Sequence, residues 1–355
     1  MEFRVNLTNL NSTTATVIQT FHTKASIKNG GYRENLVSRC ICSKSKGTYH
    51  TILSAKSRSM FPVRVTYERE VLVLPDGGII ALDWADGREE PSKMPVVIIS
   101  PALMDSSRAQ NVQRLIKLLN KRGYKSVVYI PRGCGGLALK TKQMTNGYST
   151  EELRMVISHV ASLPFTQSVY AVGFSIGGSV LLKLMGEDGT NCLLKGAVAI
   201  SPTFDYNAPH DPYEHKWWNK NLFIPMMMRF LNKHRQLLNV DETTIAQHME
   251  QSGTRAFDQM VVAPIFGFST VEELYYQSSP IRNTQCITVP TFTLSAIDDP
   301  IAETSAVPLQ GSALLGPGLV SGVTRTGGHF GFMEGILTVH SWSDRATVDW
   351  LDSCM

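Results

Sequence analysis

The sequence predicts an α/β fold: one doubly wound, mostly parallel β-sheet with a helical cap insertion. Two observations predict it. Short continuous apolar runs, typical of strands buried on both faces, alternate with segments whose apolar residues recur at helical spacing. Over residues 202–270 this alternation stops, no strand pattern occurs, and the alternation then resumes. We therefore expect an α/β core formed by residues 61–203 and 271–355, and a cap or lid formed by residues 204–270.

Two other segments precede the alternation. Residues 1–60 show no regular apolar pattern and are expected to form an N-terminal arm, a targeting segment or a disordered tail. Residues 63–74 and 78–85 are rich in β-formers and are separated by a Pro-Asp-Gly-Gly turn sequence, so they predict a hairpin.

The alternating part then predicts seven elements in chain order: a strand at 96–100, a helix at 109–122, a strand at 126–130, a helix at 151–162, a strand at 168–174, a helix at 176–186 and a strand at 196–200. Beyond the insertion, strands are expected at 289–296 and 319–324, and a closing helix at 338–351. Strands that alternate with helices in this way build a parallel sheet covered on both faces.

Composition excludes several classes of protein. The chain has 355 residues, of which 43% are hydrophobic and 18% charged, as in ordinary globular proteins. Its 34 basic and 30 acidic side chains leave a net charge of +4, and nine of the Lys or Arg residues lie within residues 1–58, so no nucleic acid partner is expected.

Because no apolar run reaches about 18 residues and no secretory signal is recognisable, we expect no transmembrane helix and an intracellular protein, cytoplasmic or organellar. The six cysteines show no zinc-type spacing, so no zinc site is expected.

A serine between a predicted strand and a predicted helix is the candidate nucleophile. Ser175 lies in Gly173-Phe174-Ser175-Ile176-Gly177, which fits the G-x-S-x-G pattern. A tight turn there lifts the hydroxyl above the sheet, and the two glycines remove Cβ atoms that would collide. The Ile176 amide would begin the helix, where an unpaired N–H can stabilise an oxyanion. A phosphate-binding turn is the alternative, but it would need a Lys-Ser/Thr or G-x-G-x-x-G pattern that this segment lacks.

A serine nucleophile requires a histidine base and an orienting acid, and in folds with such a turn the chain order is Ser, acid, His. Two histidines, His329 and His340, follow a strand downstream of a candidate acid. His329 comes directly after the last predicted strand, behind two glycines that can carry the ring over the sheet edge, whereas His340 falls within the closing helix. This placement favours His329 as the base.

The acid should follow the strand at 289–296, where Asp298 and Asp299 are adjacent. The Asp-Pro step is also typical of a turn or a helix cap, so one acid can cap while its neighbour orients the histidine. Spacing alone does not choose between them. The second oxyanion donor should come from the loop after the strand at 96–100, where the Leu103 amide is the candidate.

Taken together, these motifs resemble the AB hydrolase-4 family, the YheT-like and embryogenesis-associated carboxylesterases and phospholipases of the α/β-hydrolase fold. The similarity covers residues 47–351 and rests on an ordered set of segments: Tyr67-Glu68-Arg69-Glu70, Leu74-Pro75-Asp76-Gly77-Gly78, Ala81-Leu82-Asp83-Trp84, Arg132-Gly133-Cys134-Gly135-Gly136, Val172-Gly173-Phe174-Ser175-Ile176-Gly177-Gly178, Asp299-Pro300-Ile301 and Gly327-Gly328-His329-Phe330-Gly331-Phe332. The resemblance implies hydrolysis of carboxylic esters, often of acyl lipids, without a metal or organic cofactor. It also implies that the triad acid is Asp299, the aspartate directly before Pro-Ile.

The oxyanion loop departs from the family pattern, which usually reads Pro-Gly-Leu-Thr-Gly-Gly. Here Ala102 replaces the first glycine, and Met104-Asp105 replaces the polar, glycine-rich remainder. A Cβ atom at a position that needs φ > 0 would cost about 1 kcal/mol. A carboxylate beside a developing oxyanion would oppose catalysis. Many relatives also carry an N-terminal membrane helix, which this sequence lacks.

The insertion concentrates large apolar side chains. Tryptophans, phenylalanines and methionines crowd into residues 217–231, and Phe174, Trp217 and Met227 are candidates for contact with substrate. Packing of the cap onto the core would explain this cluster, and so would an acyl-chain pocket roofed by methionines and aromatics. Basic neighbours could also contact anionic lipid headgroups: Lys216, Lys220, Arg229, Lys233 and Arg235.

The sequence thus predicts a serine hydrolase that cleaves carboxylic esters, with Ser175, Asp299 and His329 as its triad and a small-molecule or lipid ester as its substrate. Acyl transfer to another acceptor would use the same triad. A catalytically weak binding or scaffold protein of the same fold is the alternative from a different class.

Overall fold

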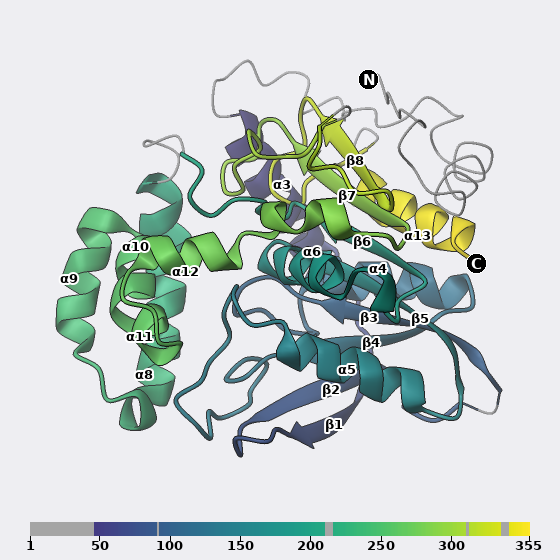
Figure 1. Ribbon diagram of the computed structural model, residues 1–355, viewed down its shortest axis with the longest axis horizontal. Helices are drawn as coiled ribbons and strands as arrows, with labels where there is room; N and C mark the ends of the chain where they lie inside the picture. Colours follow the sequence, from purple (N-terminus) through teal and green to yellow (C-terminus); the bar gives the residue numbers. More distant parts are fainter. Residues whose placement is uncertain (1–45, 91, 210–215, 310–311, 335–340) are drawn as a thin grey trace.

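The protein, as a computed structural model, is described over residues 46–90, 92–209, 216–309, 312–334 and 341–355. Its centre is an eight-stranded sheet in the order β1-β2-β4-β3-β5-β6-β7-β8 (Figure 1). The strands are β1 (Tyr67–Val73), β2 (Ile79–Ala85), β3 (Met94–Ser100), β4 (Lys125–Ile130), β5 (Thr166–Phe174), β6 (Gly196–Ile200), β7 (Thr291–Ala296) and β8 (Leu319–Thr324). The pairs β1–β2 and β2–β4 are antiparallel, and every other neighbouring pair is parallel.

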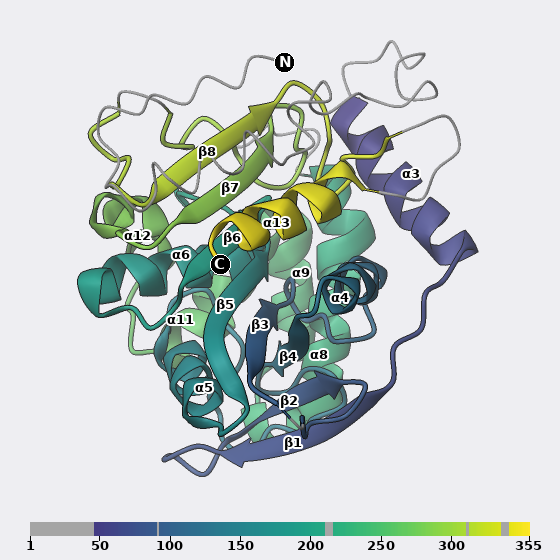
Figure 2. The same ribbon diagram turned by 90° about the vertical axis from the view of Figure 1, so that its right-hand side faces the viewer.

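Helices cover both faces of the sheet because its central strands are apolar on both sides. In β3, Val97 and Ile99 face the core layer shared with α4 (Gln110–Lys121) and α13 (Trp342–Ser353). Val96 and Ile98 face the opposite layer, shared with α5 (Glu151–Ser162) and α6 (Ile176–Asp188). Figure 2 shows α4 and α13 on one side of the sheet and α5 and α6 on the other. This arrangement is the doubly wound, mostly parallel sheet that the sequence predicts.

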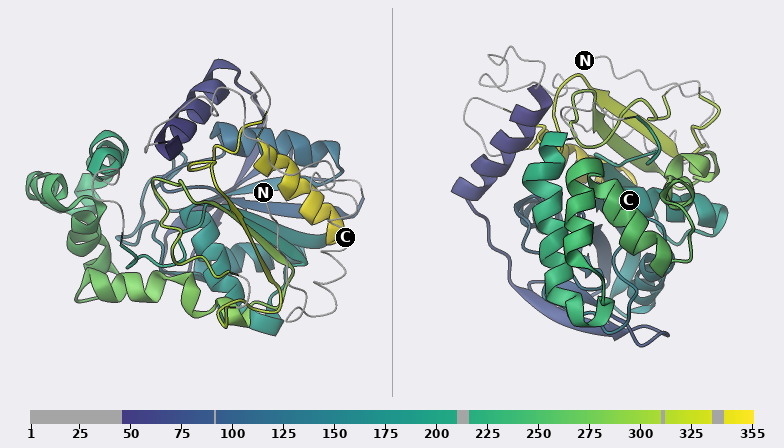
Figure 3. Two further views of the ribbon diagram at one scale, coloured as in Figure 1. Left: turned by 90° about the horizontal axis from the view of Figure 1, so that it is seen from above. Right: turned by 90° about the vertical axis from the view of Figure 1, so that its left-hand side faces the viewer.

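The cap enters between β6 and β7 and is entirely helical within the described residues. Its elements are η3 (Asn219–Phe223), α8 (Ile224–Leu238), α9 (Glu242–Ser252), α10 (Thr254–Phe257), η4 (Asp258–Val262), α11 (Ala263–Ile265) and α12 (Val271–Ser278). Short turns of 3-10 helix in the described part of the core are η2 (Gly189–Asn191), η5 (Pro280–Arg282) and η6 (Thr284–Cys286). The cap helices form a separate lobe beside the sheet (Figure 3, left). Across the described ranges, no helix combines the length and the apolar character needed to cross a bilayer.

Two end segments differ from expectation. Residues 46–60, predicted to belong to an irregular arm, form a helix, α3 (Lys46–Met60), which lies beside α4. The prediction is wrong there because α3 has no clear apolar stripe and depends on contacts with distant parts of the chain. The rest of the predicted arm, residues 1–45, lies outside the described residues. The closing helix begins at Trp342, and residues 338–340 of its predicted range also lie outside them.

Candidate active site

In the turn between β5 and α6, Ser175 has a backbone conformation that residues other than glycine rarely adopt. Its backbone has φ 51° and ψ −123°, and its N–H donates to the carbonyl of Ile200 on β6 at 2.9 Å. A non-glycine residue held in such a region costs about 1–3 kcal/mol and persists only where the surroundings enforce it. Ser175 also lines a cavity between the core and the cap. Strain of this kind beside a cavity is typical of a nucleophile turn.

The flanking glycines explain why the turn can be so tight. A Cβ atom on Gly173 would lie 2.5 Å from the Cα of Gly178, and one on Gly177 would lie 2.4 Å from the carbonyl oxygen of Pro101. Both obstacles are backbone atoms, which cannot rotate away as a side chain can. The G-x-S-x-G spacing is therefore a packing requirement between this turn and the loop that follows β3.

His329 and Asp299 form a buried pair at the ends of β8 and β7. The Nδ1 atom of His329 lies 2.9 Å from Oδ2 and 3.1 Å from Oδ1 of Asp299. Their side chains are 6% and 0% exposed. Asp299 Oδ1 also accepts hydrogen bonds from the N–H groups of Ile301 and Ala302, both at 2.9 Å. The same carboxylate therefore closes the turn after β7 and orients the imidazole of His329.

Asp298 faces the same loop through a different atom. Its Oδ1 accepts the N–H of Gly328 at 2.9 Å. Burial raises the pKa of Asp298, and the neighbouring Asp299 charge raises it further, whereas the Gly328 amide and the charge of His50 lower it. Asp298 therefore anchors the backbone of the histidine loop while Asp299 holds the ring. His340, the other histidine considered, lies outside the described residues.

The nucleophile turn and the histidine loop meet through their aromatic neighbours. The ring of Phe174, which precedes Ser175, packs edge-on against the ring of Phe330, which follows His329, with 5.6 Å between centroids. Among the hydrogen bonds of the described ranges, none joins Ser175 Oγ to the imidazole. The structure thus brings the two segments together without closing the Ser–His hydrogen bond, a geometry that is common in unliganded hydrolases.

The structure shows how the expected oxyanion loop, which follows β3, accommodates its departures from the family sequence. Leu103 and Ile176, the two predicted amide donors, line the same cavity as Ser175. The residue with positive φ is Met104, at 53°, and not Ala102, so the expected strain at Ala102 is wrong. The start of the loop passes close to Gly177, where a Cβ atom would lie 2.4 Å from the Pro101 carbonyl oxygen, and the sequence pattern does not reveal this approach.

Asp105, expected to oppose an oxyanion, does not line the cavity. Its Oδ1 accepts the N–H of Ser106 at 2.8 Å. Burial raises the pKa of Asp105, and the Ser106 amide lowers it in part. The carboxylate is therefore engaged by its own turn and does not line the cavity that Leu103 and Ile176 line.

The cavity has a volume of about 440 Å³ and lies between the core and the cap. Its wall is mainly apolar, and the apolar members are Leu103, Met104, Ile176, Ala208, Phe223, Met227, Phe257, Val262, Leu274 and Ile301. Of the three predicted substrate contacts, Met227 lines the cavity and Phe174 and Trp217 do not. Trp217 is 44% exposed and packs against Trp218, and Phe174 is buried against Phe330. A pocket of this size and character suits an acyl chain.

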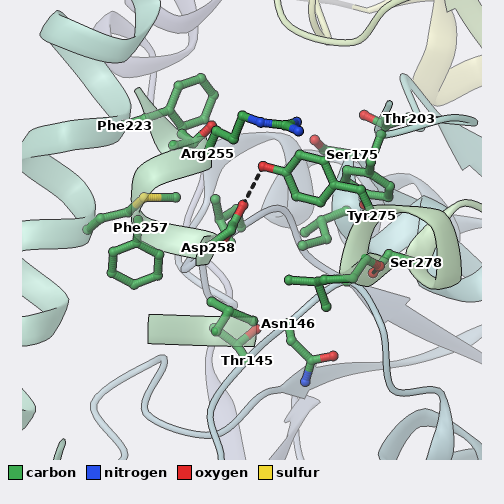
Figure 4. A pocket seen from close by; sticks show the side chains of 18 of the residues that line it. Thr145, Asn146, Ser175, Thr203, Phe223, Arg255, Phe257, Asp258, Tyr275 and Ser278 are labelled. Carbon is green, nitrogen blue, oxygen red and sulfur yellow. Dashed lines mark hydrogen bonds between the residues drawn. The ribbon is translucent and has the colours of Figure 1, made fainter. Parts of the chain in front are cut away.

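One part of the cavity wall is polar, and the sequence did not point to it. Asp258, the first residue of η4, accepts a hydrogen bond from the Tyr275 hydroxyl at 2.7 Å (Figure 4). Burial raises the pKa of Asp258 to about 7, although the Tyr275 hydroxyl and the charge of Arg255 lower it. Arg255 lies over the Tyr275 ring, 5.4 Å from its centroid, and pairs with Glu272. No motif surrounds Asp258, so only its burial in the folded protein identifies it.

Of the basic cap residues singled out in the sequence, Lys233 is engaged by the core. Its Nζ atom donates to the carbonyl oxygens of Gly133 and Leu137 at 3.1 and 2.9 Å. These bonds fasten α8 to the loop after β4, although Lys233 itself is exposed. The other four basic residues, Lys216, Lys220, Arg229 and Arg235, are also exposed.

A strained serine in a strand–turn–helix above a mostly parallel sheet, close to a buried histidine–aspartate pair, defines the class of α/β hydrolases. Within this class, the chain belongs to the Hydrolase_4 family, described as serine aminopeptidase, S33, whose model matches residues 91–310. The family resemblance drawn from the motifs is confirmed.

Two relatives and one solved structure illustrate the similarity. Phospholipase ABHD3 of Mus musculus is 31% identical over 303 residues, which cover 83% of this chain and 72% of the relative. Embryogenesis-associated protein EMB8 of Picea glauca is 29% identical over 318 residues, covering 85% and 69% of the two chains. The crystal structure of a membrane phospholipase A matches with a TM-score of 0.52 at 13% identity and covers 86% of this chain and 91% of that one, a likeness of fold alone.

Proposed function

We propose that the protein hydrolyses carboxylic esters of acyl lipids through an acyl-enzyme formed on Ser175. The observation that carries this proposal is that Ser175 lines an apolar cavity of about 440 Å³ while the histidine loop packs against its turn. The name of the relative phospholipase ABHD3, which acts on a lipid, supports an acyl-lipid substrate.

The residues suggest the following sequence of steps. Ser175 Oγ attacks the ester carbonyl carbon while His329 Nε2 takes the hydroxyl proton, and Asp299 stabilises the imidazolium from the Nδ1 side. The carbonyl oxygen becomes an oxyanion that the Ile176 and Leu103 amides stabilise. The intermediate collapses, the C–O bond to the alcohol breaks, and His329 returns the proton to the departing alcohol.

Water then completes the cycle. His329 takes a proton from water as its oxygen attacks the acyl carbon of the acyl-enzyme. The second tetrahedral intermediate expels Ser175 Oγ, which regains the proton, and the carboxylic acid leaves. One ester and one water thus give one acid and one alcohol. Another alcohol in place of water would give acyl transfer by the same steps.

Two measurements test this proposal. A fluorophosphonate probe should label the wild type and should not label Ser175→Ala, because the probe needs an activated serine. With p-nitrophenyl esters, kcat/KM should rise from acetyl toward medium-length acyl chains as more of the apolar cavity is filled. A folded wild type that resists labelling would favour the binding protein, and a flat or falling chain-length profile would contradict an acyl-lipid substrate.

A further inference from the structure

We propose that helix α3 is a positioning element of the active site, and that the Thr51 hydroxyl holds the backbone of His329 so that its imidazole stays aligned between Asp299 and Ser175. The inference rests on the proposed function for the identity of the base. It concerns a part of the chain that precedes the sheet and carries none of the triad residues.

The first contact is made by the side chain of Thr51. Its Oγ1 accepts the N–H of His329 at 2.8 Å, across 278 residues of sequence. The same hydroxyl donates to the carbonyl of Gly47, one turn earlier in α3, at 2.8 Å. Because the hydroxyl hydrogen is used within the helix, the oxygen lone pairs point outward and the group acts toward His329 purely as an acceptor.

A second contact comes from the other end of α3. The guanidinium of Arg58 donates to the carbonyl of Phe330 at 2.5 Å and reaches that of Gly331 at 3.5 Å. Arg58 is only 7% exposed. The two helix residues therefore hold the peptide groups that flank the His329–Phe330 pair, one through the N–H of His329 and one through the carbonyl of Phe330.

The loop needs such support because its backbone is strained. Phe330 has φ 66° and Phe332 has φ 41°, so two bulky residues after the base lie in the left-handed region. Conformations of this kind persist only where neighbouring groups enforce them. Arg58 bonds the carbonyl of the first of these residues, and Thr51 bonds the residue before it. One contact of α3 thus falls on the strained Phe330 and the other on the residue directly before it.

The fit between α3 and the catalytic loops is too close for side chains between them. A Cβ atom on Gly47 would lie 1.4 Å from the carbonyl oxygen of Asp298. A Cβ atom on Gly328 would lie 2.4 Å from the Gly47 carbonyl oxygen and 2.6 Å from Thr51 Oγ1. The glycines of the two segments face each other, so the backbone of α3 packs directly on the loops of both the acid and the base.

The helix also contacts the cap. The indole N–H of Trp218 donates to the hydroxyl of Thr48 at 3.2 Å. α3 therefore touches the acid loop, the histidine loop and the first helical turn of the cap. A segment with this set of contacts acts on the reaction through His329 and is a positioning element, not a catalytic one.

Kinetics of matched α3 variants test the inference. Thr51→Val keeps the shape of the side chain and removes the acceptor, Thr51→Ser keeps the acceptor, and Ser59→Ala removes an exposed hydroxyl of the same helix that bonds only the Ala55 carbonyl. With a p-nitrophenyl ester that the wild type cleaves, kcat of Thr51→Val should fall about 10- to 100-fold with KM little changed, because a small displacement of a catalytic group has an effect of this size. Thr51→Ser and Ser59→Ala should stay near wild type.

A double variant separates positioning from general destabilisation. In a His329→Ala background there is no imidazole to align, so adding Thr51→Val should leave the residual rate of folded enzyme unchanged. A Thr51→Val protein with wild-type kcat per folded molecule would overturn the inference. So would a loss of equal size in Thr51→Ser, or an equal further loss in the His329→Ala background. Failure of the wild type itself to react with ester or fluorophosphonate would instead count against the proposed function.

Discussion

Asp298 and Asp299, adjacent in the chain, hold the same loop through different atoms. Asp299 contacts the His329 ring at 2.9 Å, and Asp298 accepts the Gly328 N–H at 2.9 Å. One carboxylate therefore governs the orientation of the imidazole, and the other governs the backbone that carries it. The two roles call for different chemistry, since only the first needs a negative charge.

Amide substitutions should separate these roles. Asp299→Asn removes the charge that stabilises the imidazolium and should lower kcat about 10³- to 10⁴-fold, as loss of a triad carboxylate does. Asp298→Asn retains an oxygen that can accept the Gly328 N–H and should keep most of the activity. Steady-state kinetics with one ester measures both. Equal losses in the two variants would refute this division.

Gly177→Ala should destabilise the protein by about 3 kcal/mol or more, because the new Cβ atom would lie 2.4 Å from one backbone oxygen and 2.5 Å from another. Gly147→Ala is the matched control, since its Cβ atom would meet only side-chain atoms, the nearest being the Tyr206 hydroxyl at 3.2 Å. Urea unfolding compares the two. A Gly177→Ala protein as stable as Gly147→Ala would disprove the close crossing of the oxyanion loop.

Met227→Trp should shift acyl-chain preference toward short esters, because a larger side chain in the cavity wall occupies space meant for the chain. The ratio of kcat/KM for decanoyl over acetyl esters should fall at least about tenfold, the effect of losing one to two buried methylene groups. Leu222→Trp, at an exposed position of the neighbouring η3, should leave the ratio unaltered. An unchanged ratio in Met227→Trp would place the acyl chain elsewhere.

Asp258 should make stability depend on pH. Its pKa is raised from 3.8 to about 7 in the folded protein, so between about pH 4 and pH 7 the folded state binds more protons than the unfolded state. The free energy of unfolding that Asp258 contributes is therefore present at low pH and is lost as pH rises through 7. Relative to Asp258→Asn, the wild type should become less stable between pH 5 and pH 8 in urea titrations. A constant difference would argue against a buried Asp258.

The exposed side of the cap should bind lipid surfaces. Trp217 is 44% exposed and Leu222 is 40% exposed, and the exposed Lys216 and Lys220 lie beside them in sequence. Apolar and basic groups together favour anionic interfaces. Sedimentation with anionic phosphatidylglycerol vesicles should retain the wild type at low salt and release a Trp217→Ser, Leu222→Ser double variant. Equal binding by the two proteins would exclude this surface.

The sequence predicted the sheet well because its signal is local. The apolar run Val96–Ile99 is fully buried on both faces, as its composition indicates, and the order of strands and helices follows from the alternation. The nucleophile turn could also be predicted from the sequence. Its glycine spacing is needed because a Cβ atom at Gly173 or Gly177 would collide with nearby backbone atoms.

What the sequence did not predict depends on distant contacts. α3 is stabilised by bonds such as that from His329 to Thr51, 278 residues apart, and its own sequence carries little helical patterning. Positive φ falls on Met104 and not on Ala102, a choice of backbone conformation that the spacing of residues in this loop does not indicate. Asp258 acquires its raised pKa only from burial after the cap has folded.

The cap is inserted between β6, which ends at Ile200, and β7, which begins at Thr291. These two strands pair directly with each other in parallel register. Its length and composition can therefore change while β6 and β7 remain paired. The cap supplies part of the cavity wall from a stretch of the polypeptide that carries none of Ser175, Asp299 and His329. Grafting a different helical segment between these two strands is a direct route to a hydrolase with a new acyl preference and the same machinery.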